Sequence, residues 1–195
     1  MTVLTSPKGK AIFPHLTEAD TMFHPEGLFH VKLECPKAES EKILSAIKNG
    51  IAQEVKKQHD DNPNKAIKYA PEPYEVQDDK VVFNFKLKAS GIRKKDNKSF
   101  TQKPVISNAD LSAFDESMQI WGDSVLKIHF EPYFWNMPIG IGCTLRLKEV
   151  QVLELVTGNT SSSKADFKVE PMVAPKVKTE AVSYTHLTLP TNREV

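Results

Sequence analysis

The stretch "SVLKIHFEPYFWNMPIGIGCTLRLKEVQVLEL", residues 124–155, decides the fold, because two long runs of alternating apolar and polar residues meet at Met137 and Pro138. Alternation with a period of two places successive side chains on opposite faces of a β-strand. In the first run, Leu126, Ile128 and Phe130 share one face, which we expect to face the core. The second run loses its parity after Leu147 and again at Leu153, as a strand with β-bulges does. The stretch therefore predicts two long strands joined by a tight turn.

Two segments further upstream, residues 27–35 and residues 80–90, alternate in the same way. The apolar residues of these two segments are expected to join the same core. They are Phe29, Val31, Leu33, Cys35, Val81, Phe83, Phe85 and Leu87. Residues 10–16 predict a short opening strand, and Pro14 would confine it to a sheet edge because proline cannot donate a backbone hydrogen bond. Residues 104–107 predict a short return strand.

Residues 40–58 change to helical periodicity, with Ser40 or a neighbour as the N-cap. The apolar positions of this helix are Ile43, Leu44, Ile47, Ile51 and Val55. The elements together predict a mostly β fold, namely a five- to six-stranded antiparallel oligonucleotide-binding (OB) barrel with one inserted amphipathic α-helix. A β-sandwich is the alternative. The OB barrel usually carries its helix later in the chain, which counts against the simplest version of it.

The composition limits the class of protein. A chain of 195 residues with 39% hydrophobic content supplies one sizeable core. Lys and Arg number 26 and Asp and Glu number 25, so only local clusters of charge can indicate a polyanionic partner. No apolar run approaches the roughly 20 residues that cross a bilayer, and the N-terminus lacks the order of a signal peptide. We therefore expect a cytoplasmic protein that does not enter a membrane.

Cysteine and histidine usage argues against a metal site. Cys35 and Cys143 lie far apart in the sequence, each within an apolar strand pattern, which predicts buried free thiols in a reducing compartment. No Cys-x-x-Cys pair and no paired histidine spacing occurs. We expect no metal and no other cofactor.

Three consecutive aromatic residues follow Pro132 at the end of the first long strand. If the alternation continues, Tyr133 and Trp135 face outward on the side of Lys127. Phe134 then faces the core, unless a bulge at Pro132 reverses the assignment. Outward rings can stack on unpaired nucleobases, at roughly 1–3 kcal/mol per base whatever its identity. The alternative is that the aromatic run packs in the core or at its rim.

Basic residues gather near these rings, as the phosphates of a nucleic acid require. The polar faces of the predicted strands carry Lys86, Lys88, Lys127 and Arg146. The loop after residue 90 carries Arg93, Lys94, Lys95 and Lys98. Lysines on the polar side of a strand are usually only solvated, whereas the loop is more specific because Asp96 is the single acid between Arg93 and Lys98. Glu131 disfavours phosphate binding in the same groove.

Residues 122–156 resemble the closing strands of the single-stranded DNA-binding proteins of short-tailed bacteriophages. In that family a basic strand leads into Pro-Tyr-x-Trp-Asn, a glycine-containing turn and a final strand rich in Leu and Val. The matching residues are Lys127, Pro132, Tyr133, Trp135, Asn136 and Gly140. Residues 27–36 followed by the helix, and residues 81–90 followed by a lysine-rich loop, are also similar to the family. The resemblance spans about residues 10–156 and removes the objection to the position of the helix.

The resemblance implies an OB barrel that coats and protects single-stranded replication intermediates and assists strand annealing in phage DNA replication and recombination. It implies that Tyr133 and Trp135 stack on bases and that Lys127 contacts the DNA backbone. It also implies a homodimer in the host cell cytoplasm that contacts the phage DNA polymerase and helicase-primase. Two features depart from the family. Glu26 stands where the pattern has a basic residue, and residues 157–181 mix both charges where the family tail is acidic.

We expect residues 1–156 to form the DNA-binding domain and residues 157–181 to form a disordered tail. Residues 182–195 resemble a translated adapter from sequencing-library preparation. The expectation is that they are not native and that the native tail has been lost by truncation.

Two other classes of function are alternatives to DNA binding. A nuclease would need clustered carboxylates to hold magnesium. The paired acids available are Asp78 with Asp79 and Asp115 with Glu116. Solvated turn caps explain both pairs, so we expect no enzyme. The other class is a phage structural or adaptor domain that binds a protein through its aromatic strand end.

Overall fold

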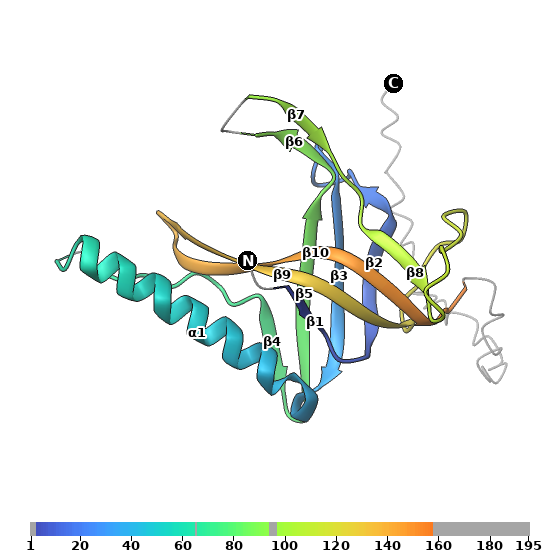
Figure 1. Cartoon of the computed structure of the whole chain (residues 1–195), viewed down its shortest axis with the longest axis horizontal. Coiled ribbons are helices and arrows are strands. Elements are labelled where there is room, and N and C mark those ends of the chain that lie inside the picture. Colours follow the sequence, from blue (N-terminus) through green and yellow to red (C-terminus); the bar gives the residue numbers. More distant parts are fainter. Residues whose placement is uncertain (1–2, 65, 94–96, 158–195) are drawn as a thin grey trace, which may run out of the picture. The chain divides into compact units, whose positions relative to one another are not determined.

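One helix and ten strands form within the residues that the computed structural model describes, which are 3–64, 66–93 and 97–157 (Figure 1). The helix is α1 (Lys37–Asp61). The long strands are β2 (Gly9–Asp20), β3 (Leu28–Pro36), β5 (Lys80–Lys88), β9 (Val125–Met137) and β10 (Gly140–Glu154). The short strands are β1 (Leu4–Thr5), β4 (Tyr74–Gln77), β6 (Ser90–Ile92), β7 (Ser99–Thr101) and β8 (Val105–Asn108).

The chain divides into two units, residues 1–160 and residues 161–195, and every described residue belongs to the first. The expected tail, residues 157–181, lies outside the described residues apart from its first residue. The whole adapter-like segment, residues 182–195, lies outside them as well. The statements made about these two segments from the sequence therefore stay predictions.

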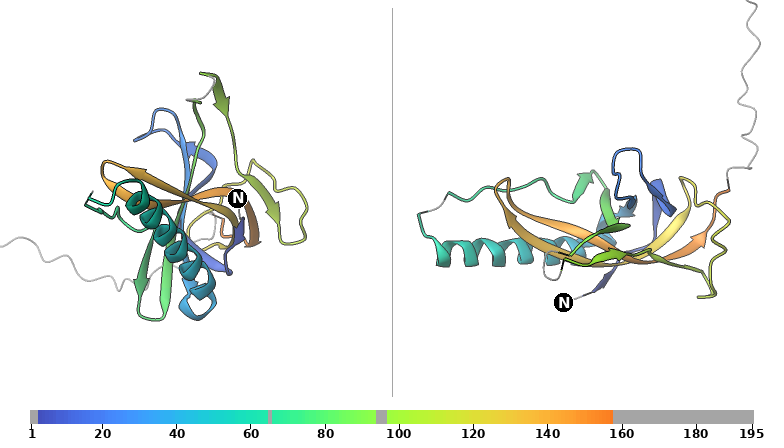
Figure 2. Two further views of the ribbon diagram at one scale, coloured as in Figure 1. Left: turned by 60° about the vertical axis from the view of Figure 1, so that its left-hand side comes forward. Right: turned by 90° about the horizontal axis from the view of Figure 1, so that it is seen from above.

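Five strands pair in a closed circuit, in the order β9-β2-β3-β5-β10 and from β10 back to β9. The pairings of this circuit are antiparallel except that of β5 with β10, which is parallel. Both views of Figure 2 show β9 and β10 as a long curved ribbon. A closed circuit covers the edges that an open sheet would expose. The fold is thus mostly β with one helix, consistent with the OB-like architecture predicted from the sequence. The sheet differs from the predicted five- to six-stranded antiparallel one, because eight strands join it and β10 pairs in parallel with β5 and β8.

The period-two pattern predicts the core correctly except at Leu87, which is only partly buried and lines the outer groove described below. On β9, Leu126, Ile128 and Phe130 are fully buried. The four predicted positions on β3 are at most 2% exposed. Phe130 meets Phe85 of β5 edge to face, with ring centroids 4.9 Å apart, a favoured aromatic geometry. The register of β10 against β9 shifts after Leu147 and again after Val152, which confirms the two predicted bulges.

Proline is tolerated in β2 because the ladder is interrupted there. The register of β2 against β3 shifts between Ile12 and His15, and Phe13 has a positive φ of 48°. Pro14 therefore lies where no regular ladder needs its missing N–H group. The sequence predicted that this strand lies at a sheet edge, and this prediction is wrong. Gly9 and Lys10 pair with β9, so β2 has a neighbouring strand on each side.

The helix α1 lies between β3 and β4 in the chain and is longer at both ends than the predicted residues 40–58. Its N-cap is Pro36, without a side-chain hydrogen bond. Ser40 is not the cap: it is buried in the first turn, where its hydroxyl donates to the Pro36 carbonyl over 2.8 Å. Ile43 and Ile47 are buried in the core cluster that the strands share, as their spacing predicts.

Cys35 and Cys143 are both free and buried, as expected. Burial raises the pKa of the Cys35 thiol to about 12, and the acids Glu39 and Glu34 add to this effect. Burial also raises the pKa of Cys143 to about 12, opposed by a backbone hydrogen bond with Tyr133. Both side chains remain protonated near neutral pH and act as apolar core groups.

The core at Phe130 supplies a test of the fold. Phe130→Ala should lower the free energy of unfolding by about 3–5 kcal/mol, because a fully buried ring leaves a cavity. Urea denaturation followed by circular dichroism measures this change. Phe23→Ala is the control: Phe23 is 77% exposed, and its loss should change stability by less than about 0.5 kcal/mol. Equal losses in the two variants would contradict the assignment of the core.

Candidate nucleic-acid interface

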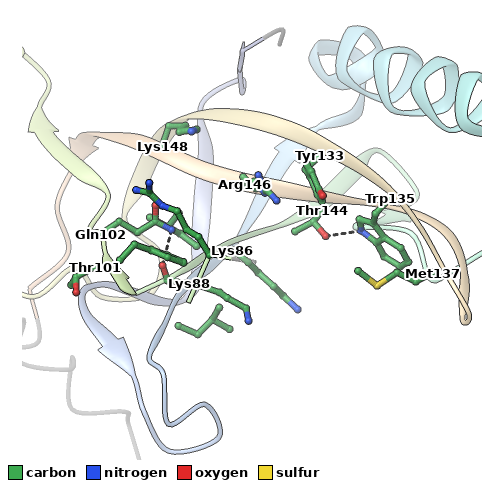
Figure 3. Close-up of a pocket in the computed structure, with 14 residues that line it drawn as sticks. Lys86, Lys88, Thr101, Gln102, Tyr133, Trp135, Met137, Thr144, Arg146 and Lys148 are labelled. Carbon is green, nitrogen blue, oxygen red and sulfur yellow. Dashed lines mark hydrogen bonds between the residues drawn. The ribbon is translucent and has the colours of Figure 1, made fainter. Parts of the chain in front are cut away.

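A groove with a volume of about 730 Å³ lies on the outer face of β5, β9 and β10, beside the β6–β7 hairpin (Figure 3). Two aromatic rings of β9 line it, those of Tyr133 and Trp135. Its cationic lining consists of Lys86, Lys88, Arg93, Arg146 and Lys148. The parallel pairing of β5 with β10 places Lys86 directly beside Arg146. Residues distant in sequence thus form one surface that carries both aromatic rings and cations.

The outward position of the two rings follows from unbroken parity along β9. The pairing of β9 with β10 continues through Pro132, and its register shifts lie elsewhere. Tyr133 is 37% exposed and Trp135 is partly buried. Phe134, between them, packs against the core on the opposite face. The outward assignment of Tyr133 and Trp135 and the inward assignment of Phe134 are both confirmed.

The Trp135 ring packs against the neighbouring strand β10. Trp135 pairs in register with Gly142, where an added Cβ would lie 2.6 Å from Cζ2 of the indole. The indole N–H donates a hydrogen bond of 3.0 Å to the Thr144 hydroxyl oxygen, which fixes the rotation of the ring. The contacts with Gly142 and Thr144 hold the indole against β10 and set its orientation in advance, as a stacking platform requires.

A cation covers the other ring. The guanidinium carbon of Arg146 lies 3.5 Å from the centroid of the Tyr133 ring, a close cation–π contact. Within the described residues no carboxylate lies at ion-pair distance from Arg146 or from Lys86. These two adjacent charges are available to a phosphate.

Two other lysines of the groove are already paired with acids. Lys148 lies 3.2 Å from the carboxylate of Glu131, which is 7% exposed. Lys88 lies 3.2 Å from the carboxylate of Glu26, at the exposed margin. The sequence placed Glu131 in the groove as an obstacle to phosphates. In the structure its buried charge is compensated by Lys148, and Glu131 does not line the groove.

Not all candidate residues come together. Lys127 lies on the outward face of β9 but pairs in register with Gln151, away from the groove lining. Lys98 is exposed on the β6–β7 hairpin and does not line the groove either. Lys94 and Lys95 lie outside the described residues. Several lining residues had no role predicted from the sequence, among them Phe100, Met137 and Thr144. An isolated Phe100 in a polar loop was the one signal available for them.

The acids considered for a nuclease do not form a metal site. Asp115 accepts hydrogen bonds from the side chain and backbone of Ser117, and these hold the pKa of Asp115 below its usual value. Glu116 forms an ion pair with Lys103 over 2.9 Å. Within the described ranges no three His, Cys, Asp or Glu side chains gather as metal ligands. In those ranges, too, no helix is both long and apolar enough to span a bilayer.

The contact between Trp135 and Gly142 can be tested directly. Gly142→Ala should displace the indole, lower the free energy of unfolding by about 1–3 kcal/mol and shift the Trp135 emission to longer wavelength. Fluorescence in a Trp121→Phe background isolates Trp135, because the sequence has 2 tryptophans. Thr144→Ser keeps the oxygen that accepts the indole hydrogen bond and is the matched control. An unchanged emission in Gly142→Ala would contradict the described ring position.

No model of a protein family matches the sequence, and no curated protein matches it. Among solved structures the chain is similar to gp2.5, a single-stranded DNA-binding protein encoded by bacteriophage T7. The TM-score is 0.68 at 23% sequence identity, over 83% of this chain and 97% of that chain. It is also similar to the single-stranded DNA-binding protein from bacteriophage Enc34 in complex with single-stranded DNA, with a TM-score of 0.51 at 14% identity, over 78% of this chain and 86% of that one. The chain therefore has the fold of bacteriophage single-stranded DNA-binding proteins, as its sequence resemblance predicts.

Proposed function

We propose that this protein binds single-stranded DNA without sequence preference. One observation carries the proposal: oriented rings line the same groove as Lys86 and Arg146, two cations that have no acidic partner among the described residues. Unpaired bases stack on Trp135 and Tyr133, and phosphates bind Lys86, Arg146 and Arg93. Neither interaction reads the hydrogen-bonding edges of the bases, so sequence tolerance follows. The fold shared with single-stranded DNA-binding proteins of phages T7 and Enc34 supports the proposal.

The position of Arg146 between ring and phosphate suggests how the two interactions combine. A guanidinium over an aromatic face keeps several N–H donors free at its rim. Arg146 can therefore hold Tyr133 in place while it donates to a backbone oxygen. Lys86, its neighbour in register, supplies a second charge for the same or the next phosphate.

We further propose the roles that the family resemblance implies. The closed strand circuit is an OB barrel that protects replication intermediates and assists annealing in phage DNA replication and recombination, without catalysis of its own. The protein acts as a homodimer in the host cytoplasm, with the phage polymerase and helicase-primase as partners. Additional phosphate contacts are proposed for Lys88 in the groove lining and for Lys98 and Lys127 outside it. From the sequence alone, the same role is proposed for Lys94 and Lys95.

Stacking predicts a loss of affinity that is specific to the groove. Oligo-dT should quench the Trp135 fluorescence, and Tyr133→Ala or Trp135→Ala should each weaken binding by roughly 1–3 kcal/mol with little dependence on base sequence. Trp121→Phe is the control, because Trp121 lies outside the groove lining. No binding at low salt would refute DNA binding. A protein ligand displaced by neither DNA nor Trp135→Ala would instead support an adaptor function.

Phosphate neutralisation predicts a change in salt dependence. Lys86→Gln should reduce the slope of log affinity against log salt by about 0.7, the value for one single-strand phosphate contact. Titrations with oligo-dT at several salt concentrations give this slope. Lys42→Gln, on the exposed face of α1, should leave it unchanged. An unchanged slope in Lys86→Gln would exclude a phosphate contact at the β5–β10 pair. The same measurement on Lys127→Gln decides whether the bound DNA strand continues along β9.

A further inference from the structure

A row of polar side chains leaves the groove and crosses the outer face of the sheet. Register pairs join Arg146 to Lys86, Lys86 to His30, and His30 to His15. Paired strands lie about 4.8 Å apart, so each member of the row is close to the next. The imidazole rings of His15 and His30 are 4.7 Å apart between centroids. His30 is therefore the first side chain that a DNA strand leaving Lys86 across β3 would meet.

An acid faces the same histidine. Oδ2 of Asp20 lies 3.5 Å from Nε2 of His30. Oδ1 of Asp20 accepts a hydrogen bond of 2.9 Å from the backbone N–H of Met22. This backbone bond, assisted by His30 and His15 and opposed by burial, holds the pKa of Asp20 below its usual value. Asp20 is therefore ionised throughout the range in which a histidine titrates.

The charge of His30 depends on the elements around it. Asp20 and His15 face it from β2 and Lys86 faces it from β5, while Lys32 is the next cation along its own face of β3. Burial holds the pKa of His30 below the ordinary histidine value. The charges of His15 and Lys86 lower this pKa further, whereas the hydrogen bond and the charge of Asp20 raise it. His30 is thus neutral at about pH 7.5, where the His30–Asp20 pair carries the negative charge of Asp20.

We propose that the His30–Asp20 pair is a proton-dependent extension of the groove, which admits a DNA backbone phosphate when His30 is protonated and repels it when His30 is neutral. The proposal rests on the DNA-binding function proposed above. Protonation changes the pair from one negative charge to none. It also gives His30 a second N–H donor beside Lys86, which has no carboxylate at ion-pair distance in the described part of the chain. The bound DNA strand can then continue from Lys86 toward β2.

Linkage fixes the sign of the effect. A phosphate near His30 stabilises its protonated form, so bound DNA raises the pKa of His30 and binding takes up a proton. By reciprocity the affinity for DNA rises as the pH falls through the pKa of His30. The extra phosphate contact also makes the salt dependence steeper at low pH, by about 0.7 in the slope.

The experiment compares oligo-dT affinity at about pH 7.5 and about pH 5.5, at constant ionic strength, for the wild type and three variants. Thymine has no group that titrates in this interval. The wild type should bind about five- to tenfold more tightly at the lower pH, and His30→Gln should lose this gain. Asp20→Asn should bind more tightly than the wild type already at the higher pH, because the amide oxygen still accepts the Met22 N–H while the charge is gone. His59→Gln, exposed on α1, should behave as the wild type.

Acid also acts on the fold itself. Because the folded protein holds the pKa of His30 below its unfolded value, this residue contributes stability above the unfolded pKa that is lost as the pH falls. Circular dichroism of each variant at both pH values controls for this loss. The measurement on Asp20→Asn is made at the higher pH, where this loss of stability does not occur. The proposal is therefore testable even if a variant unfolds at the lower pH.

The outcomes separate the two proposals. The inference is overturned if His30→Gln keeps the full pH dependence, or if Asp20→Asn leaves the affinity at about pH 7.5 unchanged. Either result leaves binding through Tyr133 and Trp135 intact. If the wild type binds no oligo-dT at either pH, the DNA-binding function itself fails, and the inference fails with it.

Discussion

The register of β9 against β10 is the constraint on which the core and the groove both depend. The two strands pair residue by residue from Met137 with Gly140 to Phe130 with Leu147. This pairing directs Phe130 inward and presents Tyr133 and Trp135 outward. A slip by one residue would exchange the two faces. Core stability and the candidate binding surface are therefore two consequences of one pairing.

The turn between these strands holds the register in place. Gly140 has a φ of 138°, and a Cβ there would come within 2.9 Å of the backbone of residues 68–70. The Ile141 N–H donates to the Lys68 carbonyl, and the Ala70 N–H donates to the Ile141 carbonyl. The segment that follows α1 is thereby hydrogen-bonded to the start of β10. Near the other end of β10 the two bulges bend the strand and shift its register against β9.

Period-two alternation could predict which face of a strand each residue occupies, because the pleat fixes it locally. It predicted the buried face of β3 and the outward rings of β9. It could not predict how far along a twisted strand a residue meets a neighbour distant in sequence. Lys127 has the correct face but lies away from the groove, whereas Phe100 enters it only through the β6–β7 hairpin. The burial of Glu131 beneath Lys148 likewise depends on a pairing that one strand cannot reveal.

The distribution of charge in the groove determines how the proposed binding would divide between bases and phosphates. Lys88 and Lys148 are engaged by Glu26 and Glu131, so a phosphate must compete with a carboxylate already in place. Arg146 and Lys86 carry no such partner among the described residues. Few cations of the groove lining are then free to release counterions, so the groove itself contributes little to the salt dependence of binding. Stacking does not weaken with salt in this way. A chain with a formal net charge of only +1 can thus hold a polyanion chiefly through its rings, with charge serving to position the strand beside them.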